Sequence, residues 1–312
     1  MFSSSTQKRF WLFNNVLDLK DMRVKANEKF RNIQLECFDE KTIDSQLYLS
    51  PDDEFVLCVG TQESAQGLCR SFQPPMPPAV VAASFMYFKR FYTRHSVMEH
   101  DPKKVMLGCL FLACKVEEFN VSIDEFARNV PSISAGDCVE TVLYYELAVM
   151  HAIDYHLTVH SPYRSFEGLF IDIKTRCPDQ SHRVEELRKD GEEFLWSSLL
   201  SDACLLYAPS QIALAAVKFS ADKANLSLTT YLNNVCENDD TAVAKLSRVL
   251  HNIVDMVTST VISENSGDKD RLMTKLRDVV TIINNAQSQK AVLNSGDKAL
   301  LKAGDFFDSE SD

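Results

Sequence analysis

The hydrophobic pattern is strongest in the first half of the chain, where the run from Val105 to Cys114 carries no charged residue. On a helix this run is apolar on both faces, which is typical of a helix buried within a larger protein. Asp101 and Pro102 precede it and supply an N-cap and a first helical position. Lys115 follows at once, and a lysine on such a helix must reach the surface or find a partner.

Further helices are predicted around this central one from apolar periodicity and from stop and start signals. The proline-rich residues 72–78 interrupt the chain, and Ser122 to Glu125 matches a capping box that starts a short helix. The helices expected in this half cover residues 79–94, 101–116, a short stretch after 122, and 139–153.

Helices are also predicted near both ends of the chain. A stripe from Leu19 to Phe30 indicates a helix over residues 16–30, and a second stripe indicates a helix over 272–283. Isolated amphipathic helices of this length are marginal in water, so both are expected to pack on the main body. Residues 305–312 are rich in acids, contain no base, and are predicted to be disordered.

A weak internal repeat relates the two halves of the chain. A shift that places Pro102 on Pro209 aligns two uncharged, proline-started segments that are rich in small residues. Small residues let neighbouring helices approach closely, so each segment is interpreted as the central helix of a bundle. Ser161 and Pro162 open the second half. The sequence therefore predicts an all-α protein built from two similar helical bundles in tandem.

Composition narrows the functional classes. Nine Gly and ten Pro among 312 residues disfavour a turn-rich β-sandwich or barrel. The net charge of -11 disfavours direct binding of nucleic acid, and the apolar segment 203–217 is too short to span a membrane. The nine cysteines include no C-x-x-C pair and no signal peptide is recognised, which favours the reducing cytosol or nucleus.

No catalytic or cofactor motif is recognised in the chain. There is no G-x-G-x-x-G, P-loop, H-E-x-x-H or G-x-S-x-G pattern. His156 and His160 have helical spacing but lack a third ligand, so they are interpreted as ordinary histidines. Cys109 and Cys114 are interpreted as small buried hydrophobes. We expect no catalytic residues, no metal and no cofactor.

The candidate site rests on two charges in apolar surroundings. Glu146 lies in an apolar stripe of the helix over 139–153, and Lys115 ends the apolar central helix. Placing either charge in apolar surroundings without a partner costs free energy. The two charges are opposite in sign and belong to neighbouring helices, so they are expected to meet. The repeat does not reproduce either charge in the second half. The pair is either a buried structural ion pair or a pair presented to another protein.

Several segments resemble a cyclin box and the cyclin fold that contains it. The resemblance covers about residues 7–262, and its second half points to the cyclins of the CDK-activating kinase. The segments that carry it are Gln7–Trp11, Met86–Tyr92, Pro102, Cys109–Phe119, Glu146, Ser161–Gly168, Ile171–Arg176 and Leu205–Leu214.

The resemblance implies two tandem five-helix cyclin boxes flanked by N- and C-terminal helices. The expected division is 1–47 for the N-terminal segment, 48–160 and 161–262 for the two boxes, and 263–312 for the C-terminal helix and tail. By similarity Lys115 and Glu146 are the kinase-contacting pair, with Glu118 and Phe119 at the edge of the contact.

The same resemblance implies a non-catalytic subunit that activates a cyclin-dependent kinase. Its expected partners are that kinase, a RING-finger assembly factor and the larger general transcription factor H complex in the nucleus. The implied substrates of the kinase are other cyclin-dependent kinases and the C-terminal tail of RNA polymerase II. A transcription cyclin of the C type and a TFIIB-like two-box factor remain as alternatives, the second disfavoured by the negative charge.

Overall fold

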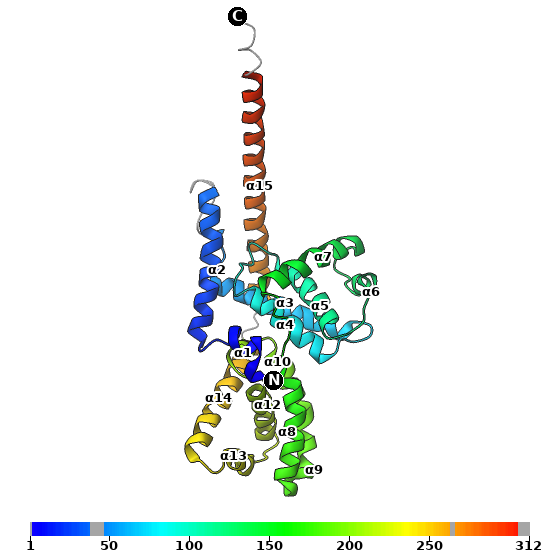
Figure 1. Ribbon diagram of the computed structural model, residues 1–312, viewed down its shortest axis with the longest axis vertical. Coiled ribbons are helices and arrows are strands. Elements are labelled where there is room, and N and C mark those ends of the chain that lie inside the picture. Colours follow the sequence, from blue (N-terminus) through cyan, green and yellow to red (C-terminus); the bar gives the residue numbers. More distant parts are fainter. Residues whose placement is uncertain (1, 38–46, 263–265, 305–312) are drawn as a thin grey trace, which may run out of the picture.

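The computed structural model describes residues 2–37, 47–262 and 266–304. Across these ranges every regular element is helical, which confirms the predicted all-α class. Two helical bundles follow one another along the long axis of the molecule. The helix Val16–Cys37 lies beside the first bundle, and the helix Ser266–Gly304 starts at that bundle and projects away from it along the long axis (Figure 1).

Each bundle contains five principal helices. The first comprises α3 (Pro51–Ser71), α4 (Pro78–Phe91), α5 (Pro102–Val116), α6 (Ile123–Arg128) and α7 (Ala135–Ala152). The second comprises α8 (Pro162–Arg176), α10 (Arg188–Ser198), α12 (Pro209–Lys223), α13 (Thr229–Val235) and α14 (Asp240–Ile262), with the short α9 (Ser181–Val184) and α11 (Ala203–Leu206) between them. Short 3-10 turns lie at Phe2–Ser4, Pro178–Gln180 and Glu185–Leu187, and the outer helices are α1 (Thr6–Phe10), α2 (Val16–Cys37) and α15 (Ser266–Gly304).

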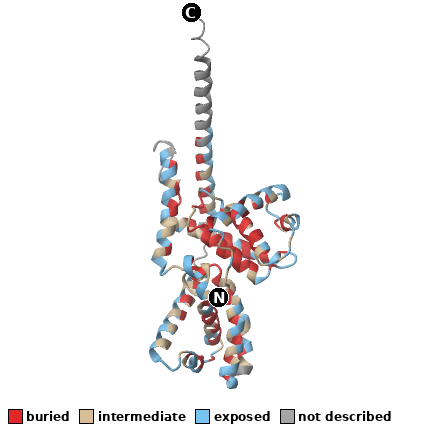
Figure 2. Cartoon of the chain, viewed as in Figure 1, coloured by how far each residue is buried: buried red, intermediate tan, exposed pale blue. Residues whose placement is uncertain are grey.

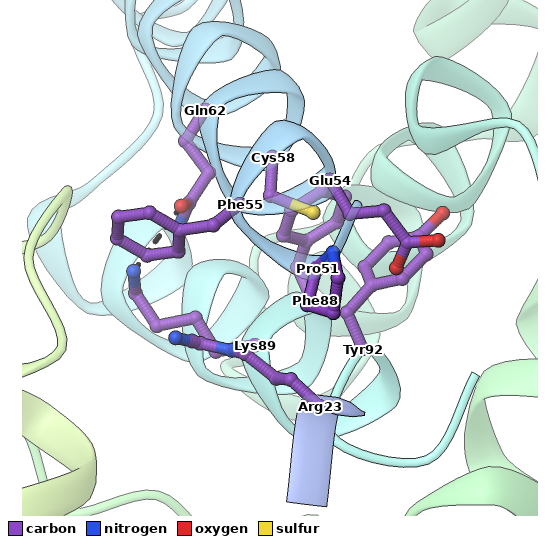
Figure 3. A pocket seen from close by; sticks show the side chains of 9 residues that line it. All are labelled: Arg23, Pro51, Glu54, Phe55, Cys58, Gln62, Phe88, Lys89 and Tyr92. Carbon is purple, nitrogen blue, oxygen red and sulfur yellow. Dashed lines mark hydrogen bonds between the residues drawn. The ribbon is translucent and has the colours of Figure 1, made fainter. Parts of the chain in front are cut away.

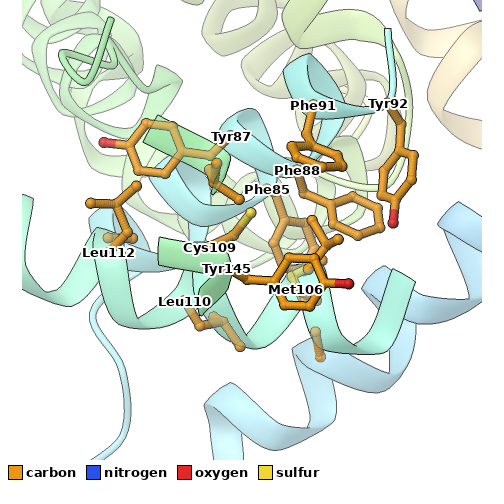
Figure 4. Packing of buried hydrophobic residues seen from close by; sticks show 14 of the residues in the cluster. Phe85, Tyr87, Phe88, Phe91, Tyr92, Met106, Cys109, Leu110, Leu112 and Tyr145 are labelled. Atoms are coloured by element: carbon orange, nitrogen blue, oxygen red, sulfur yellow. The ribbon is translucent and has the colours of Figure 1, made fainter. Parts of the chain in front are cut away.

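Helix α5 is the centre of the first bundle, as its apolar pattern predicts. The Asp101 side chain accepts a hydrogen bond from the Lys103 backbone N–H at 2.8 Å, and Pro102 occupies the first turn. The residues from Val105 to Cys114 are buried apart from Leu107, which is half-buried. Helices α3, α4 and α7 all pack against α5 (Figures 2 and 4).

The closest approach in this bundle depends on Gly108. A Cβ atom at Gly108 would lie 2.6 Å from the Tyr145 Cβ and 2.9 Å from the Tyr145 carbonyl carbon. Atoms cannot approach so closely, so α5 and α7 can pack at this distance only because residue 108 has no side chain. Glycine within a helix costs about 1 kcal/mol relative to alanine, which the close packing must offset.

The second bundle repeats this arrangement without a glycine on its central helix. Helix α12 begins at Pro209, as the repeat predicts, and packs against α8, α10 and α14. Ala213, Ala215 and Ala216 are fully buried on it. The predicted correspondence of α5 and α12 as central helices is therefore confirmed, whereas the division of the chain into the four segments given above remains a prediction.

The helices at the two ends of the chain pack as expected. Leu19, Ala26 and Phe30 of α2 are buried, and α15 buries its predicted stripe against the first bundle. The Asn27 side chain donates hydrogen bonds to the Leu49 carbonyl at 3.0 Å and to Glu54 at 2.9 Å, which fixes α2 to the start of α3. The predicted disordered tail, 305–312, lies outside the described residues.

The basic end of α4 differs from its simplest interpretation. The sequence indicates that Lys89, Arg90 and Arg94 complement the helix dipole, but Lys89 and Arg90 are only 4% and 0% exposed. Lys89 donates to the Leu200 carbonyl at 2.9 Å, and Arg90 donates to the His156 carbonyl at 2.7 Å. Both charges point into the junction between the bundles, where unpaired carbonyls need donors.

Arg23 of α2 and Lys89 of α4 both line a small cavity beside this junction (Figure 3), and both reach one carboxylate. Arg23 of α2 makes two hydrogen bonds of 2.7 Å to Asp202, which precedes α11, and Lys89 lies 4.0 Å from the same carboxylate. Burial raises the pKa of Asp202, but attraction by Arg23 outweighs this effect and leaves the pKa below its usual value. The N-terminal helix, the first bundle and the second bundle are thus joined through one carboxylate.

Glycine 108 provides a direct test of the packing. Gly108→Ala forces a Cβ against the Tyr145 backbone and should lower the free energy of unfolding by at least about 2 kcal/mol, as overpacking does. Gly168→Ala is the matched control, because Gly168 is an exposed glycine of α8 with no atom within 4 Å of its added Cβ. That control should stabilise the protein by about 0.5–1 kcal/mol. Equal effects of the two substitutions in urea denaturation would contradict the close approach.

Glu54 predicts a pH dependence of stability. Burial raises the pKa of this carboxyl from 4.5 to about 7. Between these values the folded state binds more protons than the unfolded state, so the free energy of unfolding should fall as pH rises, by up to about 3 kcal/mol at pH 8. Glu54→Gln keeps an acceptor for Asn27 and should abolish this loss. Urea denaturation at pH 5 and pH 8 measures the difference, which the exposed control Glu140→Gln should leave unchanged.

Candidate functional site

Lys115 and Glu146 meet, as the sequence analysis predicts. The Lys115 Nζ lies 2.6 Å from the Glu146 Oε1 and 2.9 Å from its Oε2, so one ammonium group bridges both carboxylate oxygens. Lys115 stands in the last turn of α5 and Glu146 near the middle of α7. The same two helices touch at Gly108, two turns earlier on α5, so the close packing sets the spacing of the pair.

The pair lies at the boundary between the protein interior and solvent. The Lys115 side chain is 51% exposed, whereas the Glu146 side chain is 11% exposed. The Lys115 Nζ also lies 4.6 Å from the centre of the Phe111 ring, which is a favourable cation–π arrangement. Glu146 therefore supports the ammonium group from within the protein, and the ammonium group faces solvent in a fixed position.

An exposed apolar strip flanks the pair on α7. Leu143, Tyr144 and Leu147 are 50%, 61% and 67% exposed, although each is a large hydrophobic or aromatic residue. Leu143 belongs to the apolar stripe predicted around Glu146 but does not join the core, since the core face of α7 carries Val142 and Val149 instead. The missed signal is the i,i+4 spacing of Leu143 and Leu147, which forms a second apolar stripe on the outer face.

Glu118 and Phe119 lie just beyond α5 and have different surroundings. Glu118 is exposed and has a positive φ of 55°, which ends the helix. The Phe119 backbone N–H donates to the Cys114 carbonyl at 2.8 Å, and its half-buried ring packs edge-on to Phe72 with centres 6.4 Å apart. Phe119 thus anchors the chain after α5 to the core, while Glu118 stands at the surface beside Lys115.

The other residues considered for chemistry have structural surroundings. Burial raises the pKa of Cys109 well above its usual value and that of Cys114 to about 12, so neither thiol is an effective nucleophile at neutral pH. The His156 Nδ1 accepts a hydrogen bond from the Trp11 Nε1–H at 3.0 Å, and the His160 backbone N–H donates to the Gln7 Oε1 at 2.7 Å. Both histidines therefore hold the N-terminal segment in place.

In the described part of the chain, no helix is both long and apolar enough to cross a membrane. One group of three possible metal ligands occurs there, formed by His95, Glu99 and His100, and no sequence motif singles it out.

Comparisons with known proteins point to one family. The family model for the cyclin N-terminal domain matches residues 69–158, and that for the cyclin C-terminal domain matches residues 161–259. The Xenopus laevis protein named Cyclin-H is 42% identical over 234 residues, which are 74% of this chain and 72% of that protein.

Solved structures share the fold. A chain in the structure of the CAK complex from Chaetomium thermophilum bound to ATP-gamma-S is similar with a TM-score of 0.77 and 22% identity, over 93% of both chains. A chain of the yeast TFIIK (Kin28/Ccl1/Tfb3) complex is similar with a TM-score of 0.60 and 25% identity, over 81% of this chain and 99% of that one.

Proposed function

The chain belongs to the cyclin family and is of the cyclin-H type, and we propose that it is the regulatory subunit that binds and activates a cyclin-dependent kinase. The observation that carries this proposal is the Lys115–Glu146 pair beside the exposed strip of α7. Tyr144 and Leu147 offer apolar area, and Lys115 offers a positioned cation. Protein interfaces combine a desolvated apolar centre with a few oriented polar groups in this way.

In the proposed mechanism, the chain acts by holding part of the kinase in its active position. A protein kinase is active only when the ion pair between its strand lysine and its mobile-helix glutamate, and its magnesium site, are both in place. A rigid partner that holds the mobile helix shifts the kinase to this state. A near-complete shift requires about 5.5 kcal/mol of differential binding, more than one ion pair supplies. The apolar strip is therefore an essential part of the proposed surface.

The chain itself supplies no catalytic group in this proposal, and the kinase performs phosphoryl transfer. By similarity to the complexes above, we propose assembly with the kinase and a RING-finger assembly factor within the larger transcription factor H, in the nucleus. The substrates proposed for the complex are other cyclin-dependent kinases and the C-terminal tail of RNA polymerase II. The kinase that co-purifies at stoichiometric ratio distinguishes this assembly from that of a C-type cyclin.

Lys115 tests the proposed surface. Lys115→Ala should weaken kinase binding by about 2–5 kcal/mol, because the groups desolvated around it lose their partner. The free energy of unfolding should fall by less than about 2 kcal/mol, since half of the Lys115 side chain is already exposed. Kinase-activation titrations beside urea denaturation measure the two effects.

The matched control for Lys115 is Lys218→Ala, which removes an ion pair with Asp222 within α12. This control should leave the activation constant unchanged. Glu146→Ala should behave like Lys115→Ala, and the double substitution should cost less than the sum of the two. Large destabilisation with an unchanged activation constant for the folded protein would contradict the proposed contact.

Leu147 tests the apolar part of the surface. Leu147→Ala should change the free energy of unfolding by no more than about 0.5 kcal/mol, because the side chain is 67% exposed. It should weaken kinase binding by about 1.5–3 kcal/mol, the value of burying a leucine side chain. The control is Ile171→Ala on α8, whose side chain is 68% exposed in the second bundle. A larger loss of binding from Ile171→Ala would place the kinase on the other bundle.

A further inference from the structure

Three side chains with metal-binding atoms converge in the turn between α4 and α5. They are His95, Glu99 and His100, and their potential ligand atoms all lie within 4.8 Å of one another. The His95 Nδ1 is 3.1 Å from the Glu99 Oε2, and the His100 Nε2 is 3.8 Å from the Glu99 Oε1. The two imidazoles therefore share one carboxylate, with one ring on each of its oxygens.

The turn that carries these residues is fixed by other contacts. Val97 and Met98 are 1% and 4% exposed, so they anchor the turn in the core. The Ser96 hydroxyl donates to the Glu54 carboxylate and accepts from the Met98 N–H at 3.1 Å. The Tyr92 hydroxyl donates to the His100 carbonyl at 2.8 Å. These contacts hold the backbone at His95, Glu99 and His100 in place without the help of the side chains of these three residues.

The spacing of the donor atoms suits a small tetrahedral ion. Zinc binds histidine nitrogen at about 2.0–2.1 Å and carboxylate oxygen at about 2.0–2.2 Å, so neighbouring ligand atoms around it are separated by about 3.3–3.5 Å. The separation is 3.1 Å from His95 to one Glu99 oxygen and 3.8 Å from His100 to the other, so the two values lie on either side of this spacing. All three potential ligand atoms lie within 4.8 Å of one another.

The surroundings also suit a zinc site with one open position. The Phe91 ring stacks on His95 with centres 4.6 Å apart and meets His100 edge-on at 5.2 Å. The Tyr145 ring also packs edge-on to His100, with centres 5.8 Å apart. This aromatic shell shields one side of the group, while the Glu99 side chain remains 42% exposed on the other.

We propose that His95, Glu99 and His100 form a binding site for one Zn²⁺ ion, with water or a partner's donor atom as the fourth ligand. Two histidines, one carboxylate and an open position are an established zinc ligand set. The bound ion links the end of α4 to the start of α5 and so stiffens the turn beside α7.

A second histidine–carboxylate pair serves as the internal comparison. The His251 Nε2 lies 3.1 Å from the Asp255 Oδ2, at the same i,i+4 spacing as His95 and Glu99. Among the residues that the structure describes, no third ligand side chain joins this pair, and both of its residues are well exposed. If a histidine and a carboxylate four residues apart were sufficient for tight binding, the two places would bind zinc equally.

The experiment titrates the full chain with Zn²⁺ alone in competition with a chromophoric chelator. One ion should bind per chain, and His95→Asn, Glu99→Gln and His100→Asn should each weaken its binding by more than the 10–100-fold that loss of an outer-sphere partner costs. His251→Asn should leave the affinity unchanged. At a hundredfold excess of free Zn²⁺ over its Kd, the midpoint of thermal unfolding should rise by about 3–6 °C in the unsubstituted chain.

Co²⁺ substitution adds a measurement that needs no variant. The unsubstituted chain should give the intense visible absorption of a four-coordinate cobalt site without the charge-transfer band of thiolate ligands, which separates this site from binding at cysteines. Retained affinity in the three variants, an equal loss in His251→Asn, a thiolate band, or no stoichiometric binding would each overturn the proposal. Circular dichroism of each variant establishes that it is folded.

Discussion

The contact between α5 and α7 at Gly108 is the constraint on which the rest of the first bundle depends. With no side chain at residue 108, the backbone of α7 at Tyr145 lies directly against α5. The two helices continue side by side, and two turns further along α5 this spacing places Lys115 within hydrogen-bond distance of Glu146. A wider separation would leave the carboxylate, which is only 11% exposed, without its partner. The close contact at Gly108 therefore determines both the packing of the core and the position of the Lys115 ammonium group.

Buried charge at the junction makes the N-terminal helix and the two bundles depend on one another. Asp202 receives two hydrogen bonds from Arg23 and lies near Lys89, while Arg90 reaches a carbonyl beyond α7 and lies 5.1 Å from the Trp11 ring centre. Each of these groups is costly to bury alone. Removing one partner strands the others, so the first bundle is held against the second by electrostatics as well as by apolar contact.

Helix α7 has two separate roles that follow from its periodicity. One face, with Val142 and Val149, completes the core, and the opposite face carries Leu143, Tyr144 and Leu147 in contact with solvent. Glu146 lies between these faces and supports Lys115. Because the core holds one face of α7 in place, the outer face is also fixed in position for a partner that packs on it. The activating role proposed for a cyclin requires such rigidity, because a flexible surface would lose binding energy to its own ordering.

The sequence by itself determined much of this protein. The uncharged run at Val105 to Cys114, the prolines at 102 and 209, and the capping residues fix the class of fold and both central helices, because helix periodicity and caps are local properties. It also identified Lys115 and Glu146, since each is misplaced in its own apolar segment. Only the tertiary structure decided that Leu143 faces solvent, that Lys89 and Arg90 turn inward, and that His95, Glu99 and His100 form one group. These depend on which surfaces neighbouring helices cover and on the exact path of a turn, and local pattern does not encode either.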